Sequence, residues 1–182
     1  PTTGDCAFTA TARFWTGCVG SGCHNTEAEA AGLFNSERQT VTLLENTLWT
    51  DTDGDKVLDQ TDGGVLAAVL RQRPTTTTLA DSTHFCCTNT VRDNSLSVAE
   101  GALFNARMLG ANLYDHNDGS YGIHNPALYE GLLASSITAV RTRYNIPASV
   151  VSPAAETAIQ AALSKPGVRY APPASVRQTA AR

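Results

Sequence analysis

The chain has 182 residues, of which 42% are hydrophobic and 16% charged, and its formal net charge is −4. That length suits one domain, or at most two small ones, with a real hydrophobic core, and the composition excludes disorder driven by charge. The acidic balance argues against nucleic acid as a partner, and no apolar stretch approaches the roughly 18 residues that a membrane span needs.

Residues 1–24 lack periodicity, and the first motif in this part of the chain reads Cys18-Val-Gly-Ser-Gly-Cys23-His24. Residues 1–26 are therefore the candidate haem attachment segment. Covalent attachment of c-type haem uses two thiols, which add to the two vinyl groups, and an adjacent His that coordinates the iron. The common spacing has two residues between the cysteines, and here there are four. A small disulfide loop between Cys18 and Cys23 and a zinc site that includes His24 are the alternatives.

A long helix follows this segment. Apolar residues recur at helical spacing from Glu27 to about Trp49. Asn25 and Thr26 are candidate N-caps, and acidic residues occupy the first turn, where the helix dipole favours them.

The next segment, residues 51–62, has the ligand spacing of a calcium loop. Its ligand positions 1, 3, 5, 7, 9 and 12 hold Asp51, Asp53, Asp55, the carbonyl of Val57, Asp59 and Asp62. Lys56 replaces the Gly of an EF-hand loop, and Asp62 replaces its bidentate Glu. The loop therefore resembles the modest-affinity loops of dockerin or thrombospondin type, with a structural role for Ca²⁺. The alternative is an acidic turn whose carboxylates are simply solvated.

A short helix is predicted from Val65 to Arg71, and residues 72–96 then lack periodicity. Compact domains rarely carry so long a connection unless it binds something. The other cysteines are Cys6, Cys86 and Cys87. Either Cys6 bridges to one of the adjacent pair, or the pair forms a vicinal bridge and Cys6 is free or bonded to another chain. Adjacent cysteines rarely both reach one metal, which weakens the zinc alternative.

Further helices carry recognisable starts. Ser97 with Glu100 three residues later is a capping-box pattern, and Asn125 precedes Pro126 at a first helical position. The predicted helices span residues 97–114, 126–144 and 154–164, and an irregular tail covers 166–182. Strand signals are weak everywhere, so the fold class is mainly α.

The stretch Asp118-Gly-Ser-Tyr-Gly-Ile-His124-Asn125-Pro126 resembles a segment of multihaem c-type cytochromes, in which G-[IV]-H-N-P precedes a helix and supplies the distal haem ligand. The four-residue cysteine spacing also resembles a variant attachment motif of that family. The resemblance covers residues 97–140 and the cysteine motif. It implies one haem c per chain, with Cys18 and Cys23 as thioether ligands, His24 as proximal ligand and His124 as distal ligand.

This sequence departs from the family because it carries one attachment motif. We therefore expect a single-haem chain or the last module of a longer one, and the start at Pro1 indicates a processed form or a piece. Met108, a rival axial ligand, is expected to pack in the core. His116 and His84 are candidates for haems of neighbouring subunits. The aromatic side chains expected to wall the haem are Phe14, Trp15 and Phe34.

Together these features predict a single haem-binding domain over residues 1–182, a helical c-type cytochrome fold with long haem-wrapping loops and a calcium-type helix-loop-helix. The expected function is electron transfer through a bis-His low-spin haem, without enzyme activity. Expected partners are other cytochromes or redox proteins, or copies of the chain in an oligomer or filament. Covalent haem and disulfides place the protein outside the cytoplasm of a prokaryote, in the periplasm, at the cell surface or secreted.

Two other functions remain open from the sequence. The first is a haem enzyme or gas sensor with an open axial site, which requires that His124 is not a ligand. The second is an extracellular binding module without haem, stabilised by calcium and disulfides.

Overall fold

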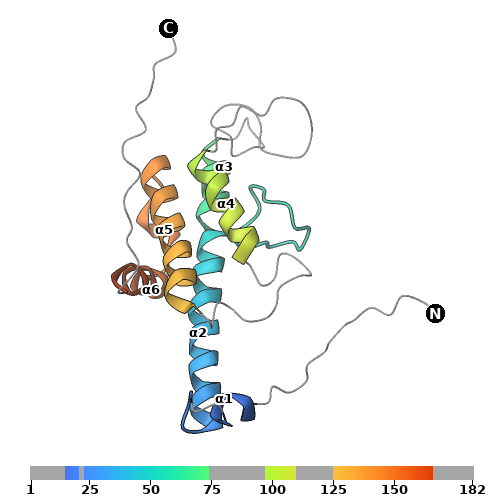
Figure 1. Cartoon of the computed structure of the whole chain (residues 1–182). Coiled ribbons are helices and arrows are strands. Elements are labelled where there is room, and N and C mark those ends of the chain that lie inside the picture. Colours follow the sequence, from blue (N-terminus) through green and yellow to red (C-terminus); the bar gives the residue numbers. More distant parts are fainter. Residues whose placement is uncertain (1–14, 21–22, 74–96, 110–124, 166–182) are drawn as a thin grey trace, which may run out of the picture. The chain divides into compact units, whose positions relative to one another are not determined.

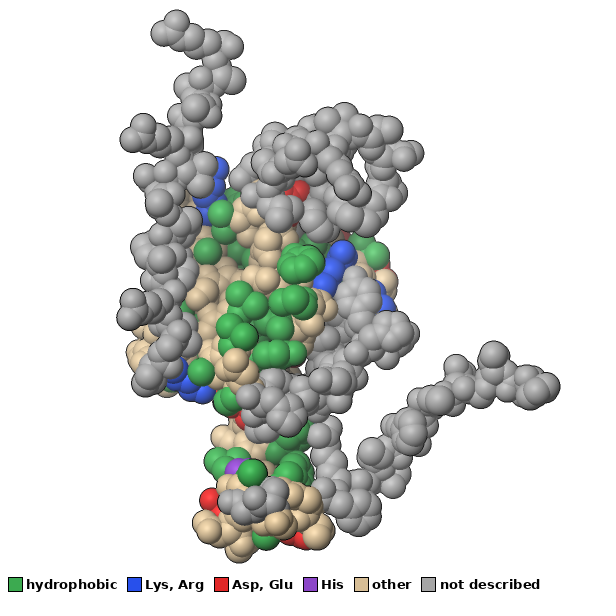
Figure 2. Space-filling view, in the orientation of Figure 1, with side chains coloured by type: hydrophobic (Ala, Val, Ile, Leu, Met, Phe, Trp, Pro, Cys, Tyr) green, Lys and Arg blue, Asp and Glu red, His purple; other side chains and the backbone are tan. Residues whose placement is uncertain are grey.

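The computed structural model describes residues 15–20, 23–73, 97–109 and 125–165. Its chain divides into two compact units, residues 1–36 and 37–182. The described residues are mainly helical, as predicted, and include one isolated β-bridge and no strand (Figure 1). No helix in these ranges is long and apolar enough to cross a membrane. Hydrophobic side chains share the face shown in Figure 2 with polar side chains and backbone.

The first unit contains α1 (Thr16–Gly20) and the beginning of α2 (Glu27–Leu48). Helix α2 was predicted nearly to the residue. The Thr26 hydroxyl accepts a hydrogen bond of 3.1 Å from the Glu29 N–H, and the Glu29 carboxylate accepts one of 2.9 Å from the Asn25 N–H. Thr26 is therefore the cap, and the two bonds satisfy amides that a helix start leaves without partners. No helix was predicted in the aperiodic segment 1–24, and α1 was missed because it is too short to show a periodic pattern.

The second unit holds the rest of α2 and the remaining helices. These are α3 (Gly64–Arg71), α4 (Val98–Leu109), α5 (Pro126–Tyr144), the 3₁₀ turn η1 (Ala148–Val150) and α6 (Pro153–Ser164). Helix α5 packs against α3, α4 and α6. The predicted helices at 65–71, 126–144 and 154–164 are confirmed. The helix predicted at 97–114 is confirmed as far as Leu109, and its last residues lie outside the described ranges.

The predicted helix starts are confirmed in detail. Ser97 and Glu100 form the capping box: the Ser97 hydroxyl accepts from the Glu100 N–H at 3.1 Å, and the Glu100 carboxylate accepts from the Ser97 N–H at 2.7 Å. The side-chain oxygen of Asn125, the residue that follows His124, accepts a hydrogen bond of 3.3 Å from the Leu128 N–H. These side chains fix where α4 and α5 begin.

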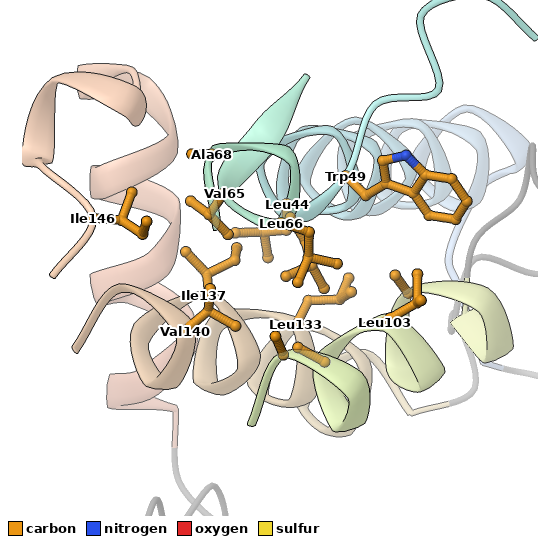
Figure 3. Close-up of a cluster of buried hydrophobic side chains, with 14 of the residues drawn as sticks. Leu44, Trp49, Val65, Leu66, Ala68, Leu103, Leu133, Ile137, Val140 and Ile146 are labelled. Atoms are coloured by element: carbon orange, nitrogen blue, oxygen red, sulfur yellow. The ribbon is translucent and has the colours of Figure 1, made fainter. Parts of the chain in front are cut away.

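The core of the second unit is one cluster of buried hydrophobic side chains (Figure 3). Leu44 of α2, Leu66 of α3 and Leu133 of α5 are completely or almost completely buried. Trp49, directly after α2, belongs to the same cluster and is 3% exposed. The cluster thus includes residues from the end of α2 and from α3, the two helices on either side of the predicted calcium loop.

Met108 is not a core residue, contrary to the prediction. Its side chain is 54% exposed, and so is that of Phe104, one turn earlier on α4. Residues four apart share a helix face. The buried face of α4 is formed instead by Ala99, Ala102, Leu103, Ala106 and Leu109. Helix α4 carries more apolar residues than one face can bury, and the sequence pattern does not say which of them are left outside.

Candidate functional site

The cysteine–histidine motif lies where α1 turns back toward the start of α2. Helix α1 begins with a hydrogen bond of 2.9 Å from the Cys18 N–H to the Trp15 carbonyl. The His24 N–H donates to the Cys18 carbonyl at 3.3 Å, which closes the motif into one turn. Cys18 and His24 are half-buried, whereas Cys23 is exposed. The turn thus keeps the proximal-ligand candidate close in space to the first cysteine of the pair.

An aromatic pair lies in the same unit as this turn. The rings of Trp15 and Phe34 have their centroids 5.2 Å apart at an interplanar angle of 52°, and Phe34 is 4% exposed. Thr16 donates a hydrogen bond of 2.7 Å to the Glu27 carboxylate. These two contacts hold α1 against the first turns of α2 and place an apolar surface beside the motif.

The chemistry of this donor set fits a covalently bound haem. Two thiols, an imidazole and an adjoining aromatic surface are the groups that such a cofactor uses. The other residues predicted to serve haem binding or disulfides lie outside the described residues: Phe14, His124, His116, His84, Cys6, Cys86 and Cys87. Met108 is described, and it lies on the exposed face of α4.

Two backbone hydrogen bonds between Thr50 and Gly63 join the two ends of the predicted calcium loop, and these ends are called its neck below. The Gly63 N–H donates to the Thr50 carbonyl at 2.9 Å, and the Thr50 N–H donates to the Gly63 carbonyl at 3.2 Å. Gly64 follows with φ +84°, and a Cβ atom there would lie 2.8 Å from the Leu48 carbonyl oxygen. Only glycine fits so close to the end of α2, so the two ends of the loop meet at a fixed place.

Three of the predicted calcium ligands come together on the loop, where Asp53 and Asp55 are exposed. Oxygens of Asp51, Asp53 and Asp55 all lie within 4.8 Å of one another. The Asp51 carboxylate accepts from the Gly54 N–H at 2.8 Å and from the Lys56 N–H at 3.0 Å. Hydrogen bonds from backbone amides thus bend the loop around the Asp51 carboxylate. The side-chain donors of the triad are all oxygen atoms, as Ca²⁺ prefers.

The other two predicted acidic ligands occupy different surroundings. Asp62 is 3% exposed, and its carboxylate accepts from the Trp49 indole N–H at 2.8 Å, the Thr52 N–H at 2.9 Å and the Asp59 N–H at 3.2 Å. The Asp59 carboxylate accepts from the N–H and hydroxyl of Thr61, at 2.6 and 2.7 Å. Asp62 therefore organises the neck of the loop in this structure, separately from the triad.

Sequence reasoning missed two residues of this neck. Trp49 was treated as the end of a helix, and its indole N–H is a partner of Asp62. Arg71, at the end of α3, donates to the backbone carbonyls of Gln60 at 3.1 Å and Asp62 at 2.7 Å. Both residues stand outside the 51–62 window, so the ligand spacing alone gave no signal for them.

The electrostatics of the loop reflect its crowded carboxylates. A hydrogen bond from the Asp55 N–H lowers the pKa of Asp53, but desolvation and the charges of Asp55, Asp59 and Asp51 outweigh it and raise that pKa above its usual value. The Thr61 hydroxyl and N–H lower the pKa of Asp59. A cation among these carboxylates would relieve the repulsion at Asp53.

No protein-family model, curated protein or solved structure matches the chain. The functional conclusion therefore rests on the chemistry of the residues themselves.

Proposed function

We propose that the protein carries electrons on a single covalently attached c-type haem. The observation that supports this most is the closed turn of Cys18, Cys23 and His24, in which the His24 N–H bonds to the Cys18 carbonyl. The two cysteines are the thioether donors, and His24 is the proximal ligand. When bound, the haem supplies the one-electron chemistry, and the protein supplies attachment, orientation and exclusion of water.

The distal ligand in this proposal is His124. It directly precedes Asn125, whose side chain caps α5, and Pro126, which begins that helix. A capped helix start restricts the backbone next to the histidine. With imidazoles on both axial sites there is no open position for a substrate, so the proposed role is electron transfer without enzyme activity.

Trp15 and Phe34 are proposed to exclude water on one side of the attachment turn. Their ring contact holds α1 and the first turns of α2 together, which keeps the two thiols and the His24 imidazole in one compact unit. One haem per chain passes electrons onward only if other haems come near. The proposed partners are therefore other cytochromes or redox proteins, or further copies of the chain, in an extracytoplasmic compartment of a prokaryote.

Calcium is proposed as a structural partner of the loop at residues 51–62. Asp51, Asp53 and Asp55 would supply carboxylate oxygens and Val57 its backbone carbonyl. Asp59 and Asp62 would complete the predicted ligand set. Because Trp49 and Asp62 join the loop to the core of the second unit, an ion here would stabilise the connection between α2 and α3.

The proposal is tested on the protein purified after expression with a c-type haem maturation system. We expect haem that stays with the chain on a denaturing gel, and a reduced spectrum with a sharp α-band that carbon monoxide leaves unchanged. A Cys18→Ala/Cys23→Ala double variant should lose the covalent haem. His124→Ala should keep the haem and respond to carbon monoxide, whereas Met108→Leu, the matched control, should behave as wild type. A His124→Ala spectrum that is indifferent to carbon monoxide would overturn the ligand assignment.

A further inference from the structure

The dipeptide Asp-Gly occurs at two places on the calcium loop and its neck, Asp53–Gly54 and Asp62–Gly63. Asp53 and Gly54 are exposed, whereas Asp62 is 3% exposed. Asp-Gly is the dipeptide in which a backbone nitrogen most readily attacks the preceding side-chain carboxyl, because glycine has no Cβ to shield its nitrogen. The same reactive dipeptide thus occupies two different environments. A third, at 118–119, lies outside the described residues.

The groups that react with each other lie close together at Asp53 and Gly54. The Asp53 carboxylate accepts a hydrogen bond of 3.2 Å from the Asp55 N–H, two residues on, so it is folded along the chain toward the Gly54 nitrogen between them. The Gly54 N–H donates to the Asp51 carboxylate at 2.8 Å, so an acceptor for its proton is in place. A Cβ atom added at Gly54 would meet nothing within 4 Å. The Gly54 nitrogen is therefore free to approach the Asp53 carboxyl carbon.

The surroundings of Asp62 and Gly63 oppose the same reaction. The Asp62 carboxylate accepts hydrogen bonds from three donors, among them the buried Trp49 indole. The Gly63 N–H donates to the Thr50 carbonyl at 2.9 Å, and a Cβ atom added at Gly63 would lie 3.0 Å from the Thr50 Cβ. These bonds must break before the two groups can react, so local opening has to come first.

We propose that Asp53 is a site of spontaneous covalent modification, at which the Asp53–Gly54 peptide isomerises to isoaspartate through a cyclic imide while Asp62–Gly63 stays intact. The Gly54 nitrogen forms a bond to Cγ of the protonated Asp53 carboxyl. The proton of the nitrogen passes to the Asp51 carboxylate and on to the carboxyl hydroxyl, which leaves as water. Neither electrons nor an outside reagent are needed for this step.

A water molecule then opens the imide. If it adds to the main-chain carbonyl carbon of Asp53 and the bond from that carbon to nitrogen breaks, the product is isoaspartate, whose main chain runs through the former side chain. If it adds at Cγ instead, aspartate is restored. The water consumed replaces the water lost in the first step, so the two products have the same composition as the starting peptide.

The modification would change the calcium loop, and this consequence rests on the calcium site proposed above. Isoaspartate adds one methylene to the main chain and moves the carboxylate of residue 53. That carboxylate now lies in a triad whose oxygens are within 4.8 Å of one another. Modified chains should therefore bind Ca²⁺ more weakly. In turn, an ion that holds the Asp53 carboxylate should slow the attack by Gly54.

The test is incubation of the haem-loaded full chain at neutral pH in chelator and H₂¹⁸O, followed by peptide mapping by mass spectrometry. Each imide that opens takes up one ¹⁸O atom, whichever product forms. We expect label and isoaspartate to appear at Asp53 at least roughly ten times faster than at Asp62, because a local opening free energy of even about 1.4 kcal/mol slows Asp62 by that factor. In urea, which removes the folded structure, the two rates should converge.

Two variants identify the reacting groups. Gly54→Ala places a Cβ atom beside the nitrogen and should slow the labelling several-fold. Asp53→Glu keeps a carboxylate but requires a larger, six-membered imide, and it should take up no label at this position. Equal rates at Asp53 and Asp62 in the folded chain, or no label at Asp53, would overturn the proposal.

The same incubation in excess Ca²⁺ tests the calcium consequence separately. Slower labelling of Asp53 than in chelator would support both the modification and the ion. Labelling at the same rate in Ca²⁺ and in chelator would contradict Asp53 as a calcium ligand, whereas the modification is decided by the rates in chelator alone.

Discussion

The indole N–H of Trp49 donates a 2.8 Å hydrogen bond to the carboxylate of Asp62, and both side chains are buried. Trp49 directly follows α2, and Asp62 lies two residues before α3 begins. Since Trp49 also belongs to the hydrophobic core cluster, this bond joins the neck of the 51–62 loop to the core of the second unit.

Removing the donor of this bond should destabilise the protein. Trp49→Phe keeps an aromatic ring in the core but leaves Asp62 with one donor fewer, and we expect a loss of about 1–2 kcal/mol in unfolding free energy. Asp62→Ala leaves the buried indole and two amides without their acceptor, and we expect about 2–3 kcal/mol. Urea unfolding followed by circular dichroism measures both. Variants as stable as wild type would show that the bond does not support the fold.

Removing calcium should lower the melting temperature. An ion that binds only the folded loop adds about 2.7 kcal/mol when its concentration is a hundred times its Kd. We therefore expect a chelator to lower the melting temperature of the wild-type protein, and excess Ca²⁺ to restore it. The matched control is the triple variant Asp51→Asn/Asp53→Asn/Asp55→Asn, which should melt identically with and without chelator. A wild-type melt that the chelator leaves unchanged would contradict the proposed ion.

The substitution Asp53→Asn should have opposite effects on the stability of the calcium-free protein and on its affinity for Ca²⁺. Neighbouring carboxylates raise its pKa, so Asp53→Asn should relieve repulsion and stabilise the calcium-free protein. The same change removes a charged ligand and should weaken calcium binding by roughly tenfold or more, at least the loss typical of a disturbed metal site. Calorimetric titration and thermal melting in chelator measure the two effects. A variant that binds Ca²⁺ as tightly as wild type would exclude Asp53 from the ligand set.

The backbone at Lys56 should be improved by glycine. Lys56 has φ +62°, in the left-handed region that glycine adopts without strain. Lys56→Gly should raise the unfolding free energy by about 0.5–1 kcal/mol, after the entropic cost of glycine in the unfolded chain. Lys56→Ala is the control, because it removes the same side chain and keeps the strain. Equal stabilities for the Gly and Ala variants would contradict this explanation.

Much of the helical fold was predictable from local sequence. The capping box of Ser97 and Glu100 and the Asn125–Pro126 start are local signals, and both appear in the structure as expected. Helix α1 was missed because five residues cannot show a period. Met108 was misplaced because α4 has more apolar side chains than its buried face, and only tertiary packing decides which of them stay exposed.

In the candidate sites too, contacts between residues close in sequence were predictable, whereas contacts between distant residues were not. The structure brings oxygens of Asp51, Asp53 and Asp55 together, since these residues lie close in sequence on one loop, and their role as calcium ligands stays a prediction. The contact of Asp62 with Trp49 could not be predicted, because the two residues are 13 positions apart and meet only through the tertiary structure.

Coordination of a covalently bound haem by His24 and His124 is tested by the visible spectrum of the purified, reduced protein before and after addition of carbon monoxide. We expect a sharp c-type α-band that carbon monoxide does not shift. A band that shifts would show an open axial site, and a protein matured with haem available that has no Soret band would contradict haem binding altogether.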